Sequence, residues 1–190
     1  MRDLFIKTLS ELCKKDSNIV LLTGDLGFGV LDNFKKQFPK NFINVGVAEQ
    51  NMTGIATGLA LEGKIAFTYS IANFPTLRCL EQIRNDACYH NANVKIISIG
   101  GGFSYGALGI SHHATEDLAI MRALPDITVI APAGEWEVVR ATKAIYSHPG
   151  TCFLRIDKSM GDDKSIRNNE DFTIGKGRLL CDGNDCTIIS

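Results

Sequence analysis

The sequence predicts an α/β fold with a mostly parallel sheet sandwiched by helices. Short apolar runs rich in Ile and Val recur along the chain, and segments of helical length and pattern separate them. Strands that alternate with such helices form βαβ units, whose parallel sheet is buried on both faces. The 190 residues, 45% of them hydrophobic, are enough for one sizeable core.

The expected strands are the apolar runs, whose length and composition are typical of buried parallel strands. They cover residues 19–22, 65–69, 94–99, 127–130 and 152–156, and a strand-like stretch lies at residues 42–45. The expected helices cover residues 4–14, 48–61, 75–89, 115–123 and 135–147. We predict that helix 48–61 packs closely against another backbone, because Gly54 and Gly58 in its interior each cost about 1 kcal/mol relative to alanine.

Composition divides the chain into one large domain and a tail. Residues 1–160 contain all of these strands and helices, and residues 161–171 are so polar that we expect a linker there. Residues 172–180 have the pattern of an interrupted strand, and residues 187–190 look like the first half of a buried strand. We therefore expect residues 172–190 to be the start of a truncated second domain.

Charge, apolar runs and cysteine content argue against several classes of partner, location and structural site. The 20 Lys+Arg and 21 Asp+Glu residues nearly cancel, so we expect neither nucleic acid nor a membrane surface as a partner. No apolar run approaches the roughly 18 residues that span a bilayer, and the first residues lack the apolar stretch of a secretory leader. The six cysteines include no Cys-x-x-Cys pair, so we expect neither disulfides nor structural zinc. A cytoplasmic protein with a small-molecule or protein partner is expected.

Glu49 is a candidate functional residue in the first turn of the expected helix 48–61, just after the strand-like stretch at residues 42–45. A carboxylate there also complements the helix dipole, so its position alone leaves a purely structural role open. Five segments occur together with it in one order, namely Thr23-Gly24-Asp25-Leu26, Gly46-Val47-Ala48-Glu49-Gln50-Asn51, Asn73-Phe74 with Leu80-Glu81-Gln82-Ile83-Arg84-Asn85, Ser111-His112-His113 with Glu116-Asp117-Leu118-Ala119-Ile120-Met121-Arg122, and Pro125 through Ala131-Pro132-Ala133. In these segments residues 1–158 resemble the pyrimidine-binding domain of transketolases, deoxyxylulose-phosphate synthases and 2-oxo-acid dehydrogenase beta subunits.

The resemblance implies the thiamine-diphosphate-binding fold and a set of cofactor contacts. Glu49 corresponds to the family's catalytic glutamate, which hydrogen-bonds a ring nitrogen of the cofactor's aminopyrimidine, and burial is expected to keep its carboxyl protonated. Asp25, Val47, Ile71 and Phe74 are the other expected cofactor contacts. Ile71 stands where the family usually has a stacking phenylalanine. A turn-stabilising role for Asp25 and a core role for Phe74 remain open.

The resemblance implies that the glycine-rich segment 98–109 is the loop over the substrate channel. Its spacing does not fit a dinucleotide fingerprint, and no lysine follows it as in a P-loop. The resemblance makes His112 a catalytic residue and His113 and Lys158 substrate contacts. Local hydrogen bonding of the histidines and a solvated Lys158 are the alternatives, and two adjacent histidines without further ligands do not predict a metal site.

Two departures from the family pattern affect the expected substrate. Gly100 stands where a histidine is expected, and Leu108 where an aspartate contacts a sugar hydroxyl. Ordinary pentose-phosphate transketolase activity is therefore not expected, although transfer of a two-carbon ketol unit between sugar or sugar phosphate substrates remains the first hypothesis. A beta-like subunit of a 2-oxo-acid decarboxylating enzyme and a catalytically silent scaffold are the alternatives.

The resemblance also implies a partner chain. Family members hold the diphosphate and magnesium on a domain with a Gly-Asp-Gly motif, which this sequence lacks. We therefore expect thiamine diphosphate as the cofactor, with magnesium held mainly by a pyrophosphate-domain chain, the N-terminal transketolase-like subunit. A homodimer or heterotetramer is the expected assembly.

Overall fold

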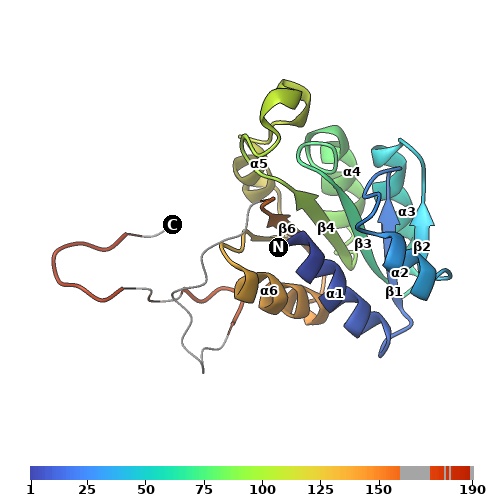
Figure 1. Cartoon of the computed structure of the whole chain (residues 1–190), viewed down its shortest axis with the longest axis horizontal. Coiled ribbons are helices and arrows are strands. Elements are labelled where there is room, and N and C mark those ends of the chain that lie inside the picture. Colours follow the sequence, from blue (N-terminus) through green and yellow to red (C-terminus); the bar gives the residue numbers. More distant parts are fainter. Residues whose placement is uncertain (159–171, 178, 180, 189–190) are drawn as a thin grey trace.

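Six parallel strands form a single sheet in the computed structural model, which describes residues 1–158, 172–177, 179 and 181–188 (Figure 1). Their order across the sheet is β2-β1-β3-β4-β6-β5, and every neighbouring pair is parallel. The strands are β1 (Ile19–Thr23), β2 (Phe42–Asn44), β3 (Ile65–Ile71), β4 (Val94–Ile99), β5 (Ile127–Ile130) and β6 (Thr151–Ile156). The predicted fold class is confirmed, and each strand lies within two residues of its predicted bounds.

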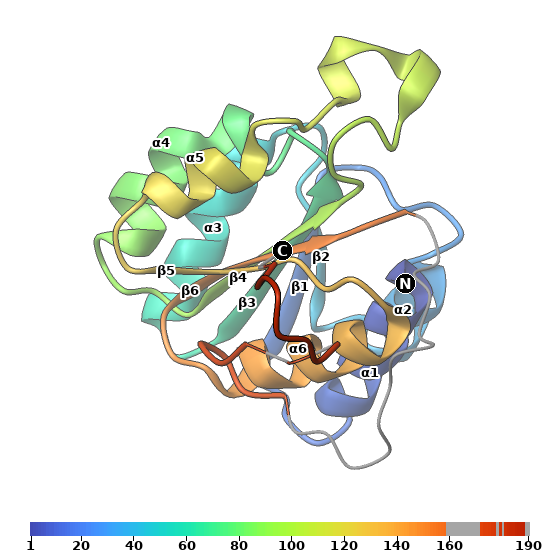
Figure 2. The ribbon, with the colours of Figure 1, turned by 90° about the vertical axis from the view of Figure 1, so that its left-hand side faces the viewer.

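Helices cover both faces of this sheet (Figure 2). On one face lie α1 (Arg2–Cys13), α2 (Asp32–Gln37) and α6 (Glu135–Ser147), which bury Phe5, Phe34 and Ile145 against it. On the other lie α3 (Glu49–Leu61), α4 (Leu80–Gln82) and α5 (Asp117–Ala123), whose side of the core includes Met52 and Met121. The central strands β1, β3 and β4 therefore have apolar residues on both faces, as their continuous apolar runs predict.

Two of the helical segments differ from the sequence predictions. The helix α2 was not predicted, because Phe34 is the only apolar residue in its six and gives no periodic pattern. The expected helix at residues 75–89 is instead a 3₁₀ turn at Leu77–Cys79, the short α4, and a π-helical stretch at Ile83–Cys88. In such a stretch the hydrogen bonds span five residues, so the regular α periodicity is lost.

The close packing predicted at Gly54 and Gly58 is wrong within the described part of this chain. A Cβ atom built at either position would have no atom within 4 Å apart from the neighbouring backbone of its own helix, and both residues are exposed. The reason is that α3 turns its glycines away from the sheet while Met52 and Ala56 enter the core.

The tail is only partly described. The linker predicted at residues 161–171 lies outside the described residues. The described residues of 172–180 form a turn rather than the expected strand, and the described part of 187–190 contains no strand. Phe172 instead packs beside Trp136 of α6, with the ring centroids 6.4 Å apart, because an aromatic ring is buried more readily than the polar residues around it. No helix among the described residues is long and apolar enough to cross a membrane.

Parallel strands bring the predicted site residues to one edge of the sheet. Asp25 follows β1, Glu49 follows β2, Phe74 follows β3, the loop with His112 follows β4, and Lys158 follows β6. All of them therefore lie beyond the carboxyl ends of the strands, where open α/β sheets bind ligands.

Candidate active site

Glu49 begins α3 and is almost completely buried, with 3% of its surface exposed. Its side chain passes beside Gly24, where an added Cβ atom would lie only 3.4 Å from Glu49 Cγ. Arg78 Nη1 donates a hydrogen bond to Glu49 Oε2 at 2.9 Å, which makes this an ion pair. The family resemblance predicts a carboxyl kept protonated by burial, and it does not predict the guanidinium beside it.

Arg78 is thus a site residue that the sequence did not reveal. Its side chain is 47% exposed, and its Cζ lies 4.6 Å from the centroid of the Phe74 ring, within range of a cation–π contact. No spacing rule connects residues 49 and 78. The available signal was chemical, because a carboxylate expected to be buried requires a cation or several hydrogen-bond donors.

Phe74 continues the row of contacts towards the glycine-rich loop. The His112 ring meets the Phe74 ring edge-on with 5.0 Å between centroids, and it lies 5.8 Å from the Tyr105 ring. Ser111 Oγ is 3.0 Å from His112 Nδ1 and so contributes to the orientation of the imidazole. His112 therefore contacts Phe74, and Phe74 in turn contacts Arg78, the ion-pair partner of Glu49.

Lys158 stands at the far end of this row, because its Nζ lies 4.7 Å from the centroid of the Tyr105 ring. Burial raises the pKa of the Tyr105 phenol. Glu49, Arg78, Phe74, His112, Tyr105 and Lys158 thus form one continuous series of contacts, which we call the site row. Residues from the ends of four different strands meet in it.

The remaining predicted residues lie beside the site row. Asp25 has a left-handed backbone with φ of 58°, and it exchanges two hydrogen bonds with the Asn44 side chain at 2.9 and 3.0 Å. Val47 is 75% exposed, and Ile71 ends β3 half-buried. The Ile71 carbonyl oxygen accepts a hydrogen bond from Phe74 N at 2.9 Å, which joins Ile71 to the site row through the backbone. Among the described residues, no hydrogen bond, ion pair or ring contact joins Asp25 or Val47 to the site row.

His113 bonds within its own loop. Its Nε2 lies 2.9 Å from the Gly106 carbonyl oxygen, and its ring lies 5.0 Å from that of Phe103. The local interaction that the sequence left open is therefore present for His113. The described residues contain no group of three or more His, Cys, Asp or Glu side chains placed to share a metal ion.

The site row has the chemical groups that an aminopyrimidine requires. A buried carboxyl can hydrogen-bond a ring nitrogen, and a half-buried phenylalanine offers an apolar face for a flat heterocycle. His112 adds an imidazole that can donate or accept a hydrogen bond, and Lys158 adds an exposed positive charge for an anionic substrate. The residues present therefore fit the pyrimidine half of thiamine diphosphate.

Comparisons with known proteins point to the same family. Residues 1–162 match the transketolase pyrimidine-binding domain. The chain is 43% identical over 194 aligned positions to a putative transketolase C-terminal section of Methanocaldococcus jannaschii, and 36% identical over 190 to an apulose-4-phosphate transketolase subunit of Phocaeicola vulgatus. All of this chain aligns in both cases, and it spans 61% of each relative's length.

A solved structure described as a split gene transketolase in an inactive beta4 tetramer is also similar. It superimposes with a TM-score of 0.82 at 37% identity, over 94% of this chain and 57% of that one. The transketolase of Campylobacter jejuni superimposes with a TM-score of 0.78 over 88% of this chain and 27% of that one, and its 20% identity supports the fold alone. The chain therefore belongs to the transketolase family and carries that family's pyrimidine-binding domain.

Proposed function

We propose that this chain is the pyrimidine-binding subunit of a two-chain, thiamine-diphosphate-dependent transketolase located in the cytoplasm. The reaction is transfer of a two-carbon ketol unit from a ketose donor to an aldose acceptor, at least one of them phosphorylated. The observation that carries the proposal is the site row, which joins a buried glutamate, a phenylalanine and a histidine by direct contacts. Relatives described as transketolase subunits support the two-chain arrangement.

Glu49 and Phe74 are the residues proposed to hold the aminopyrimidine. The Glu49 carboxyl hydrogen-bonds a ring nitrogen from the start of α3, and Phe74 provides the apolar surface beneath the ring. Thiamine diphosphate, when bound, supplies the nucleophilic carbon and accepts the electron pair when the carbon–carbon bond of the ketose breaks. Asp25, Val47 and Ile71 border the same edge of the sheet as further cofactor contacts.

His112 and Lys158 are proposed to act on the substrate. The His112 imidazole donates or accepts a proton at a substrate oxygen, and its contact with Phe74, the residue proposed to hold the aminopyrimidine, supports this role. Lys158 binds a substrate phosphate as a point charge, and the Tyr105 ring beside its ammonium group helps to orient it. His113 supports the loop through Gly106 and is a weaker substrate contact.

The diphosphate and magnesium are proposed to lie on a partner chain. This sequence lacks the Gly-Asp-Gly motif of the family's pyrophosphate domain. We infer that the active protein pairs this chain with a pyrophosphate-domain chain, as a heterotetramer built on a homodimer.

The test is reconstitution of the full chain with its pyrophosphate-domain partner, followed by assay of ketol transfer from hydroxypyruvate. We expect activity only in the pair, dependent on thiamine diphosphate, and reduced at least 100-fold by Glu49→Gln because the carboxyl is a direct cofactor contact. Glu62→Gln is the matched control, since Glu62 lies at the exposed other end of α3. A pair that binds the cofactor but transfers nothing, or a Glu49→Gln variant with full activity, would contradict the proposal.

A further inference from the structure

The loop that carries His112 has a narrow neck. Gly102 N donates to the Ala114 carbonyl oxygen at 2.7 Å, and Ala114 N donates to the Gly102 carbonyl oxygen at 2.9 Å. These two hydrogen bonds close residues 103–113 into one loop, which carries Tyr105 and His112. Whatever sets the position of the neck therefore also sets the position of His112 relative to the sheet.

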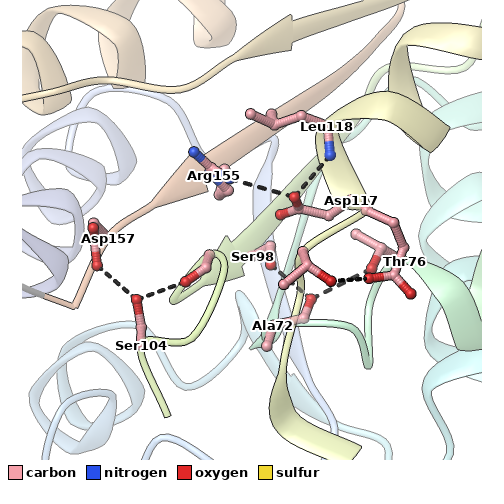
Figure 3. A network of polar contacts seen from close by, with 11 residues as sticks. Ala72, Thr76, Ser98, Ser104, Asp117, Leu118, Arg155 and Asp157 are labelled. Atoms are coloured by element: carbon pink, nitrogen blue, oxygen red, sulfur yellow. Dashed lines mark hydrogen bonds and ion pairs between the residues drawn. The ribbon is translucent and has the colours of Figure 1, made fainter. Parts of the chain in front are cut away.

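Arg155 touches both sides of this neck from the carboxyl end of β6. Figure 3 shows its contact with Asp117. Its Nη1 lies 3.4 Å from Asp117 Oδ1, three residues after Ala114. Its side chain also lies against Gly101, immediately before Gly102. A Cβ atom at Gly101 would lie 2.7 Å from both Cδ and Nη1 of Arg155, so no larger residue fits there without moving this side chain.

Burial of the Asp117 carboxyl has an unfavourable desolvation free energy. Asp117 is 1% exposed, and its Oδ1 also accepts a hydrogen bond from the Leu118 amide at 2.7 Å. Its Oδ2 has no hydrogen-bond partner within the described part of the chain. Burial raises the pKa of the Asp117 carboxyl, and the Leu118 amide and the Arg155 guanidinium counteract this effect. An ion pair of this kind contributes little net stability, which suggests that it serves to fix geometry.

The first half of the loop is fastened to the same strand end. Gly100 N donates to the Ile156 carbonyl oxygen at 2.8 Å, and Ser104 Oγ lies 2.9 Å from Asp157 Oδ1. The return half of the loop reaches β6 through the Asp117–Arg155 pair. The two halves are thus joined to one rigid strand by different residues, and removal of Arg155 loosens the return half, which bears His112.

We infer that Arg155 and Asp117 are positioning residues that set the neck of the loop and so hold His112 against Phe74. The planar guanidinium suits this role because it can lie flat against the Gly101 backbone while pointing at a carboxylate, which a lysine ammonium does not reproduce. The catalytic consequence rests on the proposed function, whereas the effect on the loop does not.

The experiment measures ketol transfer by the full chain paired with its partner. The variants are Arg155→Met, Asp117→Asn, His112→Ala and the two double variants that combine His112→Ala with Arg155→Met or with Asp117→Asn. Arg155→Met should lower kcat by roughly 10- to 100-fold, the scale expected when a proton-transfer group is displaced by about 1 Å. The affinity for thiamine diphosphate should stay within about twofold, because Glu49 and Phe74 lie outside the loop. In the His112→Ala background, Arg155→Met should lower kcat by less than about twofold, because Arg155 acts through His112.

A second measurement needs no activity. Hydrogen–deuterium exchange in the full chain should become at least about fivefold faster for residues 103–113 in Arg155→Met, and should not change in α3. Arg140→Met is the control, since Arg140 is an arginine of α6 on the other face of the sheet. Unchanged loop exchange, or kcat losses that multiply fully in the His112→Ala background, would overturn the inference. A wild-type pair without ketol transfer would instead overturn the proposed function and leave the exchange result to decide the role of Arg155.

Discussion

The Glu49–Arg78 pair yields a quantitative prediction of stability. The change is Arg78→Met, which keeps an unbranched stem over Phe74 and removes the charge that lies 2.9 Å from an oxygen of Glu49, whose side chain is 3% exposed. A hydrogen bond to a charged group contributes about 1.5–3 kcal/mol, and the 47% exposure of Arg78 favours the lower end. Loss of the cation–π contact adds about 0.5 kcal/mol. We expect the free energy of unfolding to fall by about 2 kcal/mol.

A double-mutant cycle isolates the interaction from other effects of the substitution. Glu49→Gln, Arg78→Met and the double variant are compared by urea unfolding of the full chain, and the expected coupling energy is about 1–1.5 kcal/mol. Arg84→Met is the control, because Arg84 is exposed and its Nη1 donates to the neighbouring Asn85; it should change stability by less than about 0.5 kcal/mol. A coupling energy below about 0.3 kcal/mol would refute the reasoning, since the two side chains would then not stabilise each other.

Three further predictions concern the rest of the fold. Gly54→Ala should stabilise the isolated chain by about 1 kcal/mol, because the position is helical and uncrowded; a lower melting temperature in dilute solution would show that another surface packs there. Burial raises the pKa of Cys88 from 9.0 to about 11, so between these pH values the folded chain keeps a proton that the unfolded chain has lost. Stability should therefore fall by on the order of 2–3 kcal/mol from this thiol as pH rises through that window, and urea titrations at pH 8.5 and 11 should show a smaller loss in Cys88→Ala. Lys95→Met should destabilise the chain by about 2–3 kcal/mol in urea, because Lys95 Nζ donates to the His148 and Gly150 carbonyl oxygens at 2.7 and 2.6 Å, and an unchanged midpoint would contradict this account.

The strands were predictable because a buried parallel strand has a purely local signature. The runs at residues 94–99 and 127–130 coincide with β4 and β5, and the other runs differ from their strands by one or two residues. Each of the five short motifs is also a run of neighbouring residues, and their order along the chain sufficed to identify the family that residues 1–162 match. Alternation of strand and helix then determines that the site residues gather at one edge, because every parallel strand ends there.

Other features depend on which segments meet in space. The sequence contains no periodicity that pairs Glu49 with Arg78, 29 residues away, and nothing that places Arg155 between Gly101 and Asp117. The strand order β4-β6-β5 brings the end of β6 under the glycine-rich loop, although more than 50 residues separate them along the chain. The sequence by itself thus determined the elements and the family, because both follow from neighbouring residues. Only the tertiary structure decided which charged groups pair, since those contacts depend on the order of strands across the sheet.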